Sequence, residues 1–129
     1  MPIQAFVNEG DIIPIKVWAY KHENSVFLVD QEDDIPKSIP KEDRQFIHMD
    51  FRRPSYADSL GILDGIDITD MVPGSRSMLI HDRILRSLLV DWNLKEGDKK
   101  AEINDENINL LNTDIIRGIL LRLSAIIGL

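Results

Sequence analysis

The sequence contains no cysteine in its 129 residues, which excludes disulfide bonds, thiolate nucleophiles and zinc sites built from thiolates. It also lacks an apolar run long enough to span a bilayer, because the most apolar segment, residues 115–129, is short and carries Arg117 and Arg122. The first eleven residues contain no basic segment followed by an apolar one, so we expect no signal peptide. These absences fit a protein of a reducing compartment that has no membrane partner.

A surplus of positive charge is missing as well. The chain has 15 lysine and arginine residues against 22 aspartate and glutamate residues, which gives a formal net charge of −7. An acidic surface repels the phosphates of nucleic acids and of anionic membranes, so we expect neither of them as a partner. Such a charge keeps a protein soluble and also suits basic protein partners.

Catalytic motifs are missing from the chain. It has no glycine-rich phosphate loop, nucleophile elbow or HExxH helix, and His22, His48 and His81 are far apart in the sequence. His81 falls in the middle of an apolar helical stripe, where a hydrogen-bonded histidine of a core or interface is the usual finding. We therefore expect no enzymatic activity, no catalytic residues, no cofactor and no metal.

Two acidic segments are candidate metal sites. Asp64, Asp67 and Asp70 lie in a glycine-containing loop, and clustered carboxylates suit magnesium or calcium, so a small metal-dependent enzyme is retained as a third hypothesis. Residues 91–102 match the calcium loop of an EF-hand at positions 1, 3 and 12. However, Lys95 stands at the fifth position and the glycine falls one position late. A charged turn between helices explains this second segment better.

The first half of the chain has strand patterns. Residues 12–20 and 25–30 are rich in β-branched and aromatic types, and the polar stretch between them can turn, which predicts a β-hairpin. Residues 31–45 hold charged residues and two prolines, and they predict an exposed loop that is the best candidate for mobility. Residues 46–52 alternate in polarity and predict a half-buried strand whose apolar side carries Ile47, Met49 and Phe51.

The stretch FRRPSYADSLGIL, residues 51–63, predicts a junction between that strand and a helix. Pro54 ends the strand, and Ser55 with Asp58 resembles a capping box at the start of a short helix. Residues 64–74 then form a loop. Arg52 and Arg53 are a candidate clamp for a carboxylate or another anion. Strand alternation also allows Arg52 to reach solvent while Arg53 pairs with a nearby acid.

The second half of the chain has helical periodicity. Residues 76–92 predict a helix with one apolar stripe, and Leu79 and Val90 fall on its other side, where another element or a partner must cover them. Residues 95–102 predict a charged turn. A helix over 104–112 is capped by Asn104, and Thr113 or Asp114 caps the final helix.

The final helix has two packable faces. We expect its wide stripe to face the core, and this stripe consists of Ile115, Ile116, Ile119, Leu120, Leu123, Ile126 and Ile127. The second face contains small residues, and we expect it to meet another helix of this domain, of a second copy in a homo-oligomer or of a client. The candidate partner-binding residues are therefore Gly118, Leu121, Ala125, Leu79, Val90, Arg52 and Arg53.

These elements together predict an α+β fold in a single domain, residues 1–129. Its N-terminal β-hairpin region covers residues 1–30 and the exposed proline-containing loop covers residues 31–45. A further strand and a small C-terminal helical cluster then occupy residues 46–129.

The sequence resembles the small tail assembly proteins of tailed bacteriophages, the group of tail assembly chaperones and related tail or baseplate accessory proteins. The similarity covers about residues 46–127. The segments that carry it are FRRPSYADS at 51–59, RSLLVDWNL at 86–94 and ENINLL at 106–111.

The resemblance implies a protein without enzymatic activity, so no catalytic residues carry over. Such a protein binds a tail component, often the helical tape measure protein, in the cytoplasm of the bacterial host during phage assembly. The alternative within the same group is a structural subunit that stays in the tail or baseplate.

Overall fold

The structure is a computed structural model that describes residues 5–8, 10–66 and 73–129 of the chain. It has an α+β fold, as the sequence predicts. The elements follow one another in the order β1 (Ile12–His22), β2 (Ser25–Val29), η1 (Glu32–Asp34), η2 (Lys41–Asp43), β3 (Arg44–Arg52), α1 (Tyr56–Leu63), α2 (Pro73–Leu88), β4 (Leu89–Trp92), β5 (Lys95–Glu96), β6 (Lys99–Lys100), α3 (Asp105–Asn109) and α4 (Thr113–Ile127). Strands β1 to β4 form an antiparallel sheet in the order β2-β1-β3-β4, and β5 pairs with β6.

The predicted β-hairpin is formed by β1 and β2. Its turn consists of Glu23 and Asn24, whose φ angles are 50° and 68°, and His22 pairs with Ser25 on either side of it. Positive φ at both central residues is the geometry of a type I′ turn, which matches the twist of the flanking strands. The register places Trp18, Tyr20 and Phe27 on the outer face of the sheet, away from the helices.

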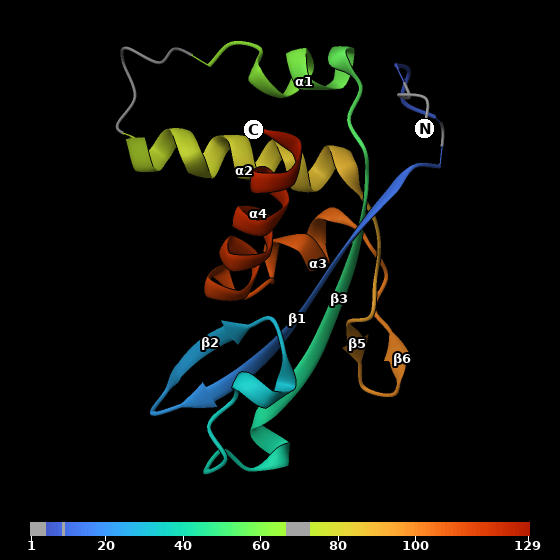
Figure 1. Cartoon of the computed structure of the whole chain (residues 1–129). Coiled ribbons are helices and arrows are strands. Elements are labelled where there is room, and N and C mark those ends of the chain that lie inside the picture. Colours follow the sequence, from blue (N-terminus) through green and yellow to red (C-terminus); the bar gives the residue numbers. More distant parts are fainter. Residues whose placement is uncertain (1–4, 9, 67–72) are drawn as a thin grey trace.

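The alternation predicted for the third strand is confirmed. Ile47, Met49 and Phe51 of β3 are at most 1% exposed, and they lie beside buried β1 residues such as Val17 in the core. Helices α2 and α4 cover this inner face of the sheet, as Figure 1 shows. The polar and aromatic positions between the buried ones form the outer face.

The long helix predicted over 76–92 is wrong at its C-terminal end. Helix α2 ends at Leu88, and the next residues form β4, in which Trp92 pairs with Met49 of β3. The Trp92 side chain is 3% exposed, and its Nε1 donates a 2.8 Å hydrogen bond to the carbonyl oxygen of Ala101. Pairing with β3 therefore decides the conformation of a segment whose pattern fits a helix as well.

Most of residues 31–45 are exposed, as predicted, but the segment is anchored to the domain at two positions. Ile35 and Ile39 are 3% and 5% exposed, and two short 3-10 helices, η1 and η2, shape the segment. Arg44 lies on the outer face and donates hydrogen bonds of 3.0 and 2.8 Å from Nε and Nη2 to the carbonyl oxygen of Ile39. Its guanidinium thus fastens the proline-containing segment to the sheet, and β3 begins at Arg44 itself.

Helix caps follow the sequence closely. Ser55 and Asp58 form the predicted capping box of α1, with reciprocal hydrogen bonds of 3.2 and 2.9 Å, and Asn104 caps α3 as predicted. The cap of α4 differs from the prediction, because the side chain of Asn112 accepts the hydrogen bond from the Ile115 N–H. Neither Thr113 nor Asp114 is the N-cap, since both already lie within α4.

Candidate functional site

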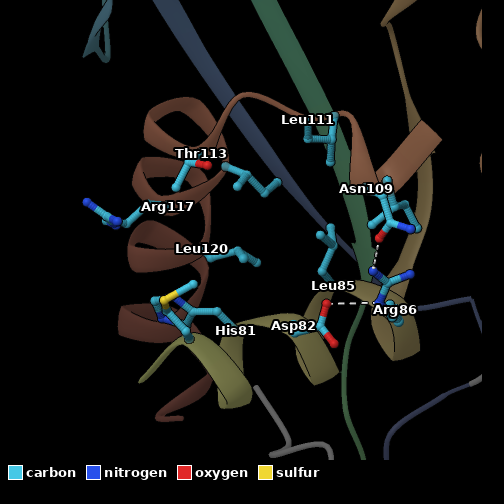
Figure 2. A pocket seen from close by; sticks show the side chains of 12 residues that line it. His81, Asp82, Leu85, Arg86, Asn109, Leu111, Thr113, Arg117 and Leu120 are labelled. Atoms are coloured by element: carbon cyan, nitrogen blue, oxygen red, sulfur yellow. Dashed lines mark hydrogen bonds and ion pairs between the residues drawn. The ribbon is translucent and has the colours of Figure 1, made fainter. Parts of the chain in front are cut away.

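Helices α2 and α4 pack against each other and leave two adjoining hollows. The first, here called the inner hollow, has a volume of about 280 Å³ and is closed at one end by α3 and the chain that follows it. Leu85 and Leu120 point into it from opposite helices (Figure 2). The second, here called the α2–α4 groove, has a volume of about 660 Å³, and Met78, His81 and Arg117 line both hollows.

A polar network closes one side of the inner hollow. The Arg86 guanidinium donates hydrogen bonds of 2.8, 2.7 and 2.6 Å to side-chain oxygens of Asp82, Asp105 and Asn109. The hydrogen bond with Asp82 is the main reason that the pKa of Arg86 lies above its usual value. Because Arg86 already neutralises Asp82 and connects α2 to α3 (Figure 2), this network has a structural role and leaves little charge for a ligand.

His81 is the titratable group between the two hollows. Its pKa is lowered from 6.5, first by burial of the ring and then by the positive charge of Arg117. His81 is therefore neutral at pH 7, and Arg117 supplies the permanent charge at this place. Within residues 10–66 and 73–129, no acidic side chain forms an ion pair with Arg117.

The rim of the α2–α4 groove carries large apolar side chains from both helices, together with the exposed Ser77. Met78 of α2 is 62% exposed and Leu121 of α4 is 57% exposed, and both line the groove. Ser124 also lines it, and its buried Oγ has no hydrogen-bond partner among the described atoms. The groove thus combines exposed apolar side chains with four polar residues, which are Ser77, His81, Arg117 and Ser124.

The predicted partner-binding residues are not all brought together. Leu121 lines the groove and Ala125 is exposed further along α4, whereas Gly118 faces Leu28 of β2 in the same chain. The small residue at 118 therefore allows a helix to approach a strand, and it does not meet another helix as predicted. Ile126, which was assigned to the core stripe, is 52% exposed.

The remaining candidates lie away from the groove. Leu79 is half-buried on α2, and Val90 lies in β4 with 49% of its surface exposed. Arg52 donates a 2.6 Å hydrogen bond to Asp58, so the arginine expected to reach solvent is the paired one. Arg53 is exposed, and its backbone N–H donates to the carbonyl oxygen of Asp11 at 2.9 Å. The two arginines do not form a clamp.

The acidic segments differ in how far they can be placed. Asp64 is exposed, and Asp67 and Asp70 lie outside the described residues. The segment with partial EF-hand spacing forms the β5–β6 hairpin, and Lys100 in it makes an ion pair with Asp91. That lysine occupies the carboxylate that a calcium ion would need, and the hydrogen bond with it lowers the pKa of Asp91.

Sequence reasoning missed the groove because its two walls come from separate helices. Met78 and His81 fall on the apolar stripe predicted for residues 76–92, and Arg117 was used only as an argument against a membrane span. One sequence feature could have indicated the site. Arg117 and Leu121 lie one helical turn apart on an otherwise apolar helix, so a charged and an apolar side chain share one face.

Comparison with protein-family models, curated proteins and solved structures found no match to this chain. In the described part of the chain, no helix combines the length and the apolar character needed to cross a membrane.

Proposed function

We propose that the protein is a non-enzymatic tail assembly protein of a tailed bacteriophage, a chaperone-like binder of a tail component such as the tape measure protein. The resemblance of residues 51–59, 86–94 and 106–111 to that group supports the phage context. The observation that carries the binding role is the α2–α4 groove, where Met78 and Leu121 expose apolar surface on facing helices.

The chemistry of the groove favours an amphipathic helix as its occupant. Apolar side chains on one face of such a helix cover surfaces like those of Met78 and Leu121. An acidic residue near that face pairs with Arg117. A tape measure protein, by the family resemblance, is a long helical client and offers many such faces.

Co-purification of the protein with the tape measure protein of the same phage tests this proposal. Leu121→Glu places a carboxylate where the client's apolar face lies, so it should weaken the complex by at least about tenfold. The matched control is Leu60→Glu on α1, because Leu60 is 53% exposed and lies outside the groove lining. Both variants should stay folded, since both leucines are exposed.

Two results would count against the proposal. If the wild-type protein does not retain the tape measure protein in co-purification, the tape measure protein is not its client. A complex that is equally strong in Leu121→Glu overturns the groove as its site. Mass spectrometry of purified virions distinguishes the chaperone from the alternative, a structural subunit of the tail or baseplate, because only the subunit is present at fixed stoichiometry.

A further inference from the structure

The strand β2 has one edge that pairs with no described strand. It lies at the margin of the sheet in the order β2-β1-β3-β4 (Figure 1). In an antiparallel hairpin with a two-residue turn, the pair that closes the turn exchanges hydrogen bonds, and bonded and non-bonded pairs then alternate. Because His22 and Ser25 close this turn, Phe27 also bonds to β1, and the N–H and C=O groups of Val26 and Leu28 point away from the sheet.

Nothing on β2 protects this edge. Its five residues, SVFLV, contain no charge and no proline, and sheet proteins commonly place lysine, proline or a bulge at an edge that must not pair. Among residues 10–66 and 73–129, no backbone group outside β1 bonds to β2. A strand of this kind is a template for another strand.

The opposite edge of the same sheet is protected. The strand β4 carries Asp91, whose carboxylate makes an ion pair with Lys100 of β6. The β5–β6 hairpin folds back beside β4, where Ala101 accepts from Trp92 Nε1 and donates its N–H to the carbonyl oxygen of Leu94. The contrast between the two edges indicates that the open edge of β2 serves for pairing.

We propose that β2 pairs antiparallel with β2 of a second copy of this chain, around a two-fold axis at Phe27, so that the two sheets become continuous. This register exchanges hydrogen bonds between Val26 of one copy and Leu28 of the other, about four bonds in all. It places the two Phe27 rings, each 44% exposed and stacked on Tyr20 at a centroid distance of 5.3 Å, beside each other across the axis.

The distribution of charge favours antiparallel pairing with a second copy. The residues that follow β2 are acidic, with Asp30, Glu32, Asp33 and Asp34 in sequence. Parallel pairing would place the two acidic stretches side by side. Antiparallel pairing separates them and brings each one to the turn end of the other copy, where Lys21 and Glu23 balance each other in charge. The strand between is uncharged, so two copies of an acidic chain can approach there.

Amide hydrogen exchange of the wild-type protein, followed by NMR over a range of concentrations, tests the proposal directly. The amides of Val26 and Leu28 should exchange more slowly as the dimer forms. The amides of Ser25 and Phe27 already bond to β1 and serve as the internal control. We expect a weak dimer, because a five-residue strand covers less than the roughly 800 Å² per partner of a standard interface.

Analytical ultracentrifugation of variants provides the second measurement. Val26→Pro removes an outward N–H without removing a bond to β1, and Phe27→Lys brings two cations together at the axis. Each should raise the dimer dissociation constant by at least about tenfold. The matched control is Val90→Lys in β4, since Val90 is 49% exposed and should leave association unchanged.

Each remaining outcome overturns the proposal. A protein that stays monomeric up to about 1 mM excludes the second copy as the occupant. A dimer that is unaffected by Val26→Pro and Phe27→Lys uses another surface. Slowed exchange of Val26 and Leu28 on addition of the tape measure protein, with a wild-type chain that remains monomeric, assigns the edge to a client strand instead.

Discussion

Arg52 and Asp58 are joined by a 2.6 Å hydrogen bond from Nη1 to Oδ2, which connects the last residue of β3 to the first turn of α1. The same carboxylate oxygen accepts the Ser55 N–H at 2.9 Å. These two hydrogen bonds lower the pKa of Asp58 from 3.8 to about 2. The bond with Arg52 has the larger effect, and the bond with the Ser55 backbone has the second largest. The strand-to-helix junction is therefore held by a carboxylate that stays ionised to low pH.

The stability of this junction should depend on pH. Because the folded pKa of Asp58 lies below its unfolded value of 3.8, its stabilising effect is complete above about pH 4 and is lost as the pH falls toward 2. Urea denaturation of wild type and Asp58→Asn should therefore differ most above pH 4 and converge toward pH 2. A difference that stays constant over this range would show that Asp58 does not supply the effect.

The proline-containing segment should contribute to stability. Ile39 is 5% exposed, so Ile39→Ala should lower the free energy of unfolding by roughly 2–5 kcal/mol, through lost burial and the cavity that remains. Ser38 is exposed, and Ser38→Ala provides the control in the same segment. A denaturation midpoint that Ile39→Ala leaves unchanged would show that the packing of Ile39 does not stabilise the fold.

Position 118 should tolerate a large side chain far less well than position 125. A Cβ at Gly118 meets Cδ1 of Leu28, so Gly118→Leu must displace the Leu28 side chain that packs between β2 and α4. We expect it to destabilise the fold by about 1–3 kcal/mol in thermal or chemical denaturation. Ala125→Leu is the matched control on the same helix, because Ala125 is exposed. Equal effects of the two substitutions would contradict the packing of Gly118 on Leu28.

The charge of Arg117 should be measurable at His81. Arg117→Gln removes a cause of the lowered pKa, so the His81 imidazole should titrate closer to 6.5 in NMR spectra. As the pH falls below 6.5, His81 is protonated in the unfolded state before it is protonated in the folded state, so the free energy of unfolding decreases. This decrease should be smaller in Arg117→Gln than in the wild type. Arg122→Gln is the control, since Arg122 pairs with Asp30 on another side of α4. An unchanged His81 pKa in Arg117→Gln would show that the charge of Arg117 does not act on His81.

Local patterns predicted the local structure. The alternation of Ile47, Met49 and Phe51, the capping box of Ser55 and the cap of Asn104 each depend on residues within one strand or one turn. Their side chains act on neighbouring backbone groups or on one sheet face. Sequence spacing alone therefore contains the relevant geometry.

Long-range contacts decided the features that sequence reasoning missed. Leu88 to Trp92 fits a helical stripe and a strand equally well, and the choice depends on β3. The side chain of Asn93 extends that pairing, since its Oδ1 accepts the His48 N–H and its Nδ2 donates to the Phe46 carbonyl oxygen, both at 2.9 Å. The α2–α4 groove likewise exists only once both helices are packed, so spacing within one helix cannot define it.

The cover of the inner sheet face has a consequence for biosynthesis. Strands β1, β2 and β3 come from neighbouring parts of the chain and can pair as soon as they leave the ribosome. Their inner face carries Val17, Ile47 and Met49, and α4, which packs on β1 and β2, is the last described element to be synthesised. The nascent chain therefore exposes an apolar sheet face until α4 has been synthesised, and during that interval the uncovered face is prone to aggregation.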